Sequence, residues 1–170
     1  MQVDFHYYCM FVLAFHAGFA KEEARIIAYS SQYVDDATES RPINFEQYLF
    51  DPIRTAYYSL KAYNWDVQKK IYIPFHFLPP NPLRSTNQFT YVTQPNSNFA
   101  KIVLKEASKK KTENWLHCLG TALHTYADTW AHEGFSGRHN IENKVEDINL
   151  YEREKWKHLL WENIFLDALP

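Results

Sequence analysis

The chain has 170 residues, of which 46% are apolar. This length is typical of one domain with a substantial core, and the apolar content excludes a largely disordered chain. The 18 basic and 20 acidic residues give a formal charge of −2, so no overall positive field exists to bind a nucleic-acid backbone or an anionic membrane. We therefore expect a single domain over residues 1–170 without an extended nucleic-acid surface.

The first apolar stretch is not typical of a membrane or secretion signal. It runs from Val3 to Ala20, contains Asp4, His6 and His16, and lacks a basic leader. The sequence thus predicts no transmembrane segment. As written, the chain is expected to be cytoplasmic, or secreted or periplasmic if a leader has been removed.

Helix signals dominate the first third of the chain. The pattern predicts a buried helix over residues 3–17 that ends at Gly18, and an amphipathic helix over residues 21–37 that forms a hairpin with it. Asp51-Pro52 is typical of a helix start, with a capping carboxylate followed by proline at the first helical position. We expect this helix to run to about Tyr63.

Prolines interrupt the pattern between residues 71 and 98. Five fall in this insert: Pro74, Pro79, Pro80, Pro82 and Pro95. We expect a long surface loop, with a short strand pair around Ile71 and residues 89–93. Helices are then expected over residues 98–111, from a cap at Thr112 to Gly134, and over residues 141–166. The predicted fold class is all-α, a single-domain multi-helix bundle with a long Pro-rich loop.

The helix expected after Thr112 carries the most informative pattern, Trp-Leu-His-Cys-Leu-Gly-Thr-Ala-Leu-His-Thr-Tyr-Ala-Asp-Thr-Trp-Ala-His over residues 115–132. At about 100° per residue, Asp128 lies roughly 40° and His132 roughly 80° around the axis from His124, and His117 lies within about 20° of His124. Burial of this helix brings imidazoles and a carboxylate close to the interior, where they need partners. A metal ion is such a partner.

Further candidate ligands are spread along the chain. His158 and Glu162 stand four residues apart and so repeat the spacing of His124 and Asp128. The other candidates on the expected helices and the Pro-rich loop are His6, Asp35 and His76. Weaker candidates, as ligands or as groups that orient a ligand, are Asp4, Asp36, His117 and His139.

These ligand types follow one another in the order His, Asp, His, His-x-x-x-Asp, His, His-x-x-x-Glu. The order resembles that of the zinc-dependent phospholipase C and single-strand-specific nuclease family, all-helical enzymes that hydrolyse phosphodiesters at a three-zinc cluster. Three local signatures also resemble an uncharacterised bacterial family: Asp4-Phe5-His6-Tyr7-Tyr8, Ser31-Gln32-Tyr33-Val34-Asp35-Asp36 and Leu123-His124-Thr125-Tyr126-Ala127-Asp128-Thr129-Trp130-Ala131-His132.

The resemblance implies a ligand set for each metal ion. The first zinc would be held by Asp35, His76, His124 and Asp128. The second would be held by His132, His158 and Glu162. A third would share Asp128 as a bridge and bind His6. That family completes the third site with an N-terminal tryptophan, whereas this chain begins Met1-Gln2-Val3-Asp4, so Asp4 substitutes or the site holds two ions or one.

We therefore expect a metal-dependent hydrolase that acts on a phosphoester or phosphodiester, with Asp128 and Asp35 as catalytic residues. Imidazole and carboxylate ligands favour zinc, and iron or manganese remain open because no thiolate excludes harder metals. Metal-activated water would be the nucleophile, and the partner would be a small-molecule or phosphoester substrate. The alternatives are a non-catalytic helical module stabilised by metal, and a His-Asp phosphohydrolase, whose adjacent His-Asp dipeptide this chain lacks.

Overall fold

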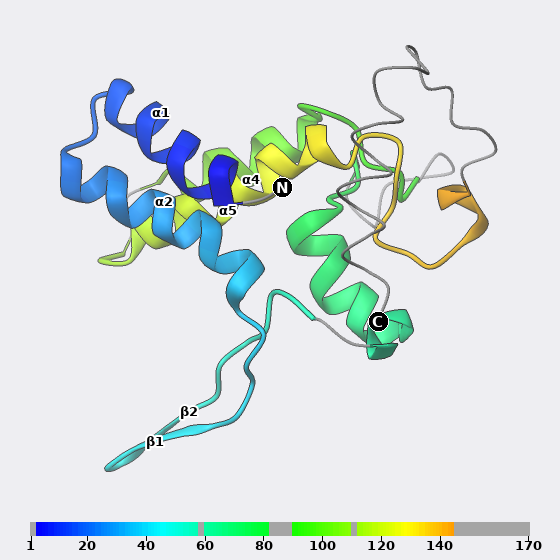
Figure 1. The fold of residues 1–170 in the computed structure, drawn as a ribbon, viewed down its shortest axis with the longest axis horizontal. Coiled ribbons are helices and arrows are strands. Elements are labelled where there is room, and N and C mark those ends of the chain that lie inside the picture. Colours follow the sequence, from blue (N-terminus) through cyan, green and yellow to red (C-terminus); the bar gives the residue numbers. More distant parts are fainter. Residues whose placement is uncertain (1–2, 58–59, 82–89, 110–111, 145–170) are drawn as a thin grey trace, which may run out of the picture.

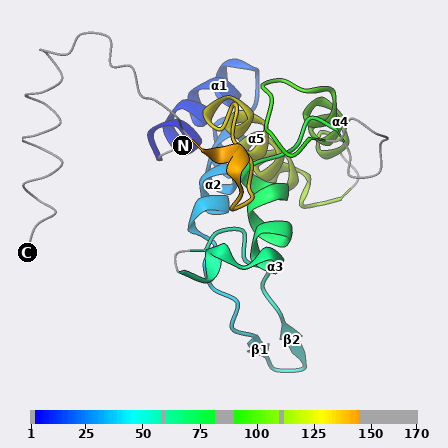
Figure 2. The ribbon, with the colours of Figure 1, turned by 90° about the vertical axis from the view of Figure 1, so that its right-hand side faces the viewer.

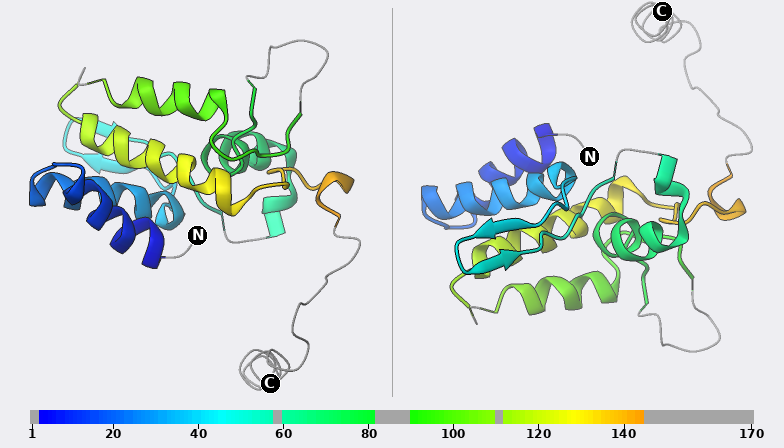
Figure 3. Two further views of the ribbon diagram at one scale, coloured as in Figure 1. Left: turned by 90° about the horizontal axis from the view of Figure 1, so that it is seen from above. Right: turned by 90° about the horizontal axis from the view of Figure 1, so that it is seen from below.

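The computed structural model describes residues 3–57, 60–81, 90–109 and 112–144 (Figure 1). Apart from one small hairpin, the regular elements of these residues are helical, as expected for an all-α protein. Figure 3 shows α5 (Trp115–Ala131) between α4 (Asn98–Ala107) on one side and α1 (Met10–His16) with α2 (Lys21–Asp36) on the other. The helix α5 is therefore the central element of the fold.

The two N-terminal helices lie where the sequence predicts them, but the first is not the buried helix that was expected, because only His6, Met10 and Ala14 of residues 3–17 are buried. A π-helical segment, η1 (Asp4–Cys9), continues directly into α1, and Gly18 with a φ of +97° follows the end of α1. Glu23 fixes the start of α2, because its carboxylate accepts a hydrogen bond of 2.9 Å from the backbone N–H of Ala20. The two helices return as the expected hairpin.

The core lies where α1, α2 and α5 meet. Its buried side chains are small or medium in size: Met10, Ala14, Ala24, Ile27, Ala28 and Leu119. Gly120 allows a close approach of α2 and α5, because a Cβ at this position would lie 2.4 Å from the backbone oxygen of Ile27. The absence of a side chain at Gly120 thus sets the spacing between these two helices.

The helix expected from Asp51 to Tyr63 is wrong. Before this segment lies a hairpin that was not predicted from the sequence. Its strand β1 (Ile43–Phe45) is antiparallel to β2 (Tyr48–Phe50), with Ile43 opposite Phe50. The hairpin projects from the helices (Figure 2). Residues 51–57 then run without regular structure, because the backbone N–H groups of Thr55 and Ala56 both donate to the carbonyl of Ala37. Among the described residues of the expected range, the one regular element is a 3₁₀ turn, η2 (Leu60–Tyr63).

The Pro-rich insert begins later than expected. The short helix α3 (Trp65–Val67) continues into the π-helical η3 (Gln68–His76), which contains Pro74. The N–H of Phe77 donates to the carbonyl of Tyr72, five residues earlier, and such a wide turn relieves the clash of a proline ring with the preceding turn. The predicted loop start and strand at Ile71 are therefore wrong. Residues 90–93 form no strand, and residues 82–89 lie outside the described ranges.

The start of α4 matches the prediction, whereas its end and both ends of α5 differ from it by a few residues. Ser97 caps α4, because its hydroxyl accepts a bond of 3.1 Å from the N–H of Ala100. Thr112 does not cap α5, since its backbone carbonyl, not its side chain, accepts from Trp115. The helix α5 ends before the expected Gly134, whose φ is +81°. Of the predicted helix over residues 141–166, a 3₁₀ turn, η4 (Ile141–Asn143), is described, and residues 145–166 lie outside the described ranges.

The helices of the described residues were also compared with what a bilayer requires. None combines the length and the apolar character needed to cross a membrane.

Replacement of Gly120 by alanine should destabilise the protein, although alanine is normally the better helix residue. The new methyl group would press on the Ile27 carbonyl and on Cβ of Ser30, which would lie 2.7 Å away. Overpacking of this kind costs about 1–3 kcal/mol, so we expect Tm to fall by roughly 3–10 °C. Calorimetry measures the change. Cys118→Ala, at an exposed position on the same helix, is the control, and an unchanged Tm for G120A would contradict the close approach.

Candidate metal centre

Three donor atoms form a nearly equilateral triangle inside the fold. Nε2 of His124 lies 3.2 Å from Nδ1 of His76 and 3.1 Å from Oδ2 of Asp128, and the third side, from His76 to Asp128, is 3.2 Å. Two ligands each about 2.1 Å from one ion lie roughly 3.0–3.4 Å apart in octahedral or tetrahedral geometry. A single shared proton can serve only one side of this triangle, whereas one ion serves all three.

Two further residues extend the triangle toward the surface. Oδ1 of Asp35, at the end of α2, lies 3.7 Å from the nearest donor nitrogens of both His76 and His124. Nε2 of His132 lies 3.5 Å from Oδ2 of Asp128, and the His132 ring packs on Phe77 at 4.1 Å between ring centroids. The Asp35 and His132 side chains are 22% and 27% exposed, so the centre reaches solvent on their side.

His6 contacts the other oxygen of each carboxylate. Its Nε2 lies 3.2 Å from Oδ1 of Asp128 and 3.9 Å from Oδ2 of Asp35. The imidazole of His6 also stacks on that of His124, with ring centroids 3.9 Å apart. Asp35 and Asp128 therefore present one oxygen to the His76 and His124 side and the other to His6. The two carboxylates thus belong to two neighbouring sets of possible metal ligands, one with His76 and His124 and the other with His6.

The electrostatics of the centre favour a cation. The side chains of His6, His124 and Asp128 are fully buried. Nδ1 of His6 and Nδ1 of His124 make no hydrogen bond within the described residues, and the 3.2 Å contact of His6 Nε2 with Asp128 lacks hydrogen-bond geometry. Buried polar atoms without partners are rare in native proteins, and an ion would satisfy the Nε2 of His6 together with the carboxylates. This buried group of histidines and aspartates can hold a metal ion.

The protonation states fit the same conclusion. Burial alone would raise the pKa of the Asp128 carboxyl, but contacts with His124, His132, His6 and His76 lower it well below its ordinary value. Burial lowers the pKa of His124, and the contact with Asp128 opposes this only in part. Asp128 is therefore a carboxylate and His124 a neutral imidazole at neutral pH, which are the ligand forms that a metal requires.

His76 is held by the backbone. Its Nε2 lies 2.7 Å from the carbonyl oxygen of Thr55, which can only accept, so Nε2 carries a proton and, in a neutral ring, Nδ1 has the lone pair that faces Asp128. The expectation that His76 belongs to a loop is wrong, because it is the last residue of η3. The role of Thr55 was missed, since a backbone carbonyl leaves no signal in the side-chain pattern.

The weaker candidates lie outside the cluster. His117 bonds through Nδ1 to the Ser30 hydroxyl at 2.8 Å, and His139 packs edge-on against the ring of Tyr63. Asp36 accepts a bond from Gln32, and Asp4 accepts one from the backbone N–H of Phe5. His158 and Glu162 fall outside the described residues, so their assignment stays a prediction.

The fold and the site together define an all-helical protein with a buried cluster of histidines and aspartates. The chain belongs to a family of unknown function (DUF6765), whose profile matches residues 1–165. The comparisons with curated proteins and with solved structures found no match.

Two adjacent aspartates in α2 offer a matched test of the metal centre. Asp35→Asn removes one charged ligand, so we expect the purified protein to lose at least half of its bound metal, measured by elemental analysis. Asp36→Asn removes the same charge from the neighbouring exposed position and should leave metal content within experimental error. Equal metal content in both variants, or less than about a tenth of an equivalent in the wild type after reconstitution, would contradict the metal centre.

Proposed function

We propose that this protein is a metal-dependent hydrolase that cleaves a phosphoester. The observation that carries the proposal is the triangle of His76, His124 and Asp128 beside a partly exposed edge formed by Asp35 and His132. A catalytic centre needs ligands that hold the ion and an open side for water and substrate. The triangle supplies the ligands, and the exposed edge supports an open side for water and substrate.

Zinc is the ion that we propose for this centre. The ligand atoms of the centre are imidazole nitrogens and carboxylate oxygens, with no thiolate among them. Manganese or iron also suits these ligands. Bound there, zinc would lower the pKa of a water molecule to about 7 and so supply hydroxide near neutral pH. The two shared carboxylates also accommodate more than one ion, in keeping with the multi-zinc family that the sequence resembles.

The residues of the chain have separate tasks in this proposal. Asp128 and Asp35 hold the ion and balance its charge, and His124 and His76 complete its coordination. His132 contacts Asp128 from the exposed side, where an incoming phosphoester would meet the centre. We therefore assign His132 to ligation or proton transfer at the open edge. A bound ion would supply hydroxide for hydrolysis, and His132 in its proton-transfer role would give a proton to the ester oxygen as its bond to phosphorus breaks.

A metal-stabilised module without catalysis is the second candidate. The observation in its favour is the complete burial of His6, His124 and Asp128, which belong to η1 and α5 and so tie separate elements together. In a structural site the protein side chains close every coordination position. The two candidates therefore differ in whether metal removal affects catalysis or only stability.

Metal-dependent hydrolysis is the direct test. The metallated protein should hydrolyse bis(p-nitrophenyl) phosphate or p-nitrophenyl phosphate, chelator should abolish the release of p-nitrophenol, and zinc or manganese should restore it. Calorimetry on the same samples reports stability. A protein that carries metal and loses stability on chelation, but is inactive on a broad panel of phosphomonoesters and phosphodiesters, would support the structural module instead.

His132→Ala tests the open edge separately. Its side chain is 27% exposed and contacts the cluster from outside the triangle, so we expect Tm to change by no more than about 3 °C while kcat falls by at least tenfold. Glu133→Ala, at the next and exposed position, is the control and should retain full activity. Retained activity in H132A would remove His132 from the proposed machinery.

A further inference from the structure

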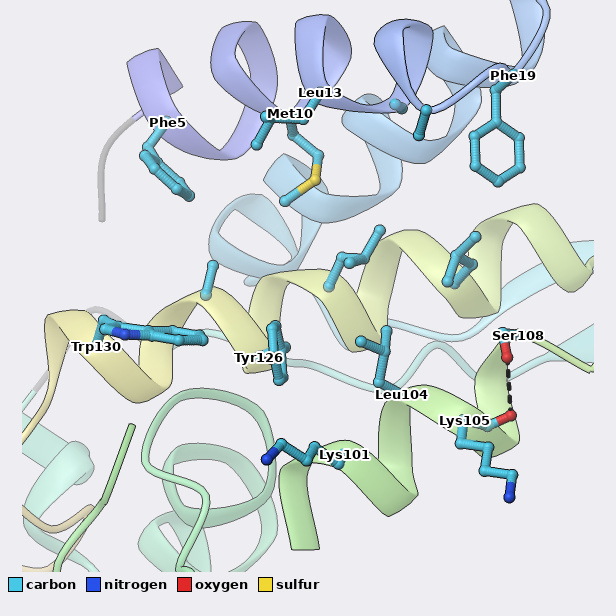
Figure 4. Close-up of a pocket in the computed structure, with 15 residues that line it drawn as sticks. Phe5, Met10, Leu13, Phe19, Lys101, Leu104, Lys105, Ser108, Tyr126 and Trp130 are labelled. Carbon is cyan, nitrogen blue, oxygen red and sulfur yellow. Dashed lines mark hydrogen bonds between the residues drawn. The ribbon is translucent and has the colours of Figure 1, made fainter. Parts of the chain in front are cut away.

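A large apolar groove lies on a different face of α5 from the metal centre. It has a volume of about 930 Å³ and runs between α1, α4 and α5 (Figure 4). Its walls include Met10 and Leu13 from α1, Leu104 from α4, and Leu123 and Trp130 from α5. Leu13 and Trp130 are 53% and 48% exposed. Apolar surface gathered in one groove to this extent marks a binding site for another apolar element.

The positive charges of the groove lie on α4. Lys101 and Lys105 line it and are one helical turn apart, and neither forms an ion pair within the described residues. An occupant that is apolar and carries negative charge on one side would match both features of the groove.

The C-terminal sequence has this composition. Residues 156–167 read Trp-Lys-His-Leu-Leu-Trp-Glu-Asn-Ile-Phe-Leu-Asp, and seven of these twelve side chains are large and apolar. Its charged residues are the acids Glu162 and Asp167 and one base, Lys157, near its start. The segment therefore offers apolar side chains for the groove and carboxylates for the lysines of α4.

The lengths are compatible. The groove lining on α5 runs from Leu119 to Trp130, which spans about 17 Å at 1.5 Å per residue. Residues 156–167 would cover about 18 Å in helical form. The intervening residues 145–155 reach up to about 36 Å when extended, and they leave the described chain at Lys144, beyond the end of α5 that carries Trp130.

We propose that residues 156–167 dock into this groove of their own chain, with Glu162 or Asp167 beside Lys101 and Lys105. The docked segment covers the apolar walls of α1, α4 and α5. Because the groove and the metal centre lie on different faces of α5, docking removes His158 and Glu162 from the metal ligands. The metal centre then consists of side chains from the described residues.

Hydrogen exchange of the full-length chain, followed by mass spectrometry, tests the docking. In the wild type, amides of residues 156–167 should exchange at least tenfold more slowly than in an unstructured peptide of the same sequence. Leu104→Asp places a charge in the groove and should abolish this protection. Ile102→Asp makes the same change on the same helix at an exposed position outside the groove lining, and should preserve it.

A second pair of variants tests the opposite wall. Leu13→Asp lies in the groove and Val12→Asp beside it, and both positions are exposed in α1. Slow amide exchange in α2 and α5 of each variant shows that its fold is intact. If the aspartate variants of α4 do not fold, Leu104→Ala and Ile102→Ala replace them. Unprotected residues 156–167 in the wild type, or protection that survives both groove substitutions, overturns the proposal. Protection that disappears on dilution to monomer, or requires lipid vesicles, also overturns it and assigns the groove to a second copy or to lipid.

Discussion

The fully buried carboxylate of Asp128 is the constraint on which the rest of the structure depends. An ionised carboxylate without partners inside a protein costs several kcal/mol, so its surroundings must supply compensating charge and hydrogen bonds. The side chain lies within about 3.5 Å of four imidazoles, those of His6, His76, His124 and His132. Because these come from η1, η3, α5 and the residue that follows α5, their convergence fixes how the first helix and the Pro-containing helix sit against α5.

Local sequence signals predicted the helices whose ends carry their own determinants. Gly18 ends the first helix with a positive φ, and Ser97 caps α4, although only the former was recognised in advance. The Asp51-Pro52 signal failed because tertiary bonds from Thr55 and Ala56 to the carbonyl of Ala37 tie that segment to the end of α2. Pro74 misled in the opposite direction, since a wide π-type turn tolerates a proline that an α-helix would exclude. In both cases a local propensity yielded to a contact that the sequence does not display.

The part of the candidate site that lies on one helix was predictable from local sequence spacing, whereas the part that comes from other segments was not. The four-residue spacing of His124 and Asp128 places them on one face of α5, and the structure brings them within 3.1 Å. His117 lies almost on the same stripe, but seven residues amount to about 10.5 Å along the axis, too far for a shared ligand sphere. His6, Asp35 and His76 join through tertiary folding. Their candidacy came from residue type and from the resemblance to a metalloenzyme family, because no local pattern shows that three separate segments meet.

The central helix presents two chemically different faces, and this separation shapes how function can be dissected. One face holds the histidines and carboxylates, and the other forms the apolar groove with Leu123 and Trp130. A charge placed in the groove on α4 or α1 should disturb packing without entering the coordination sphere of a metal ion. A ligand removed from the cluster, in contrast, leaves Asp128 with fewer partners and so weakens both metal affinity and the packing of η1 and η3 against α5. Substitutions on the two faces of α5 should therefore have separate effects. Changes in the cluster should remove metal and leave the groove intact, and changes in the groove should remove its contacts and leave the metal bound.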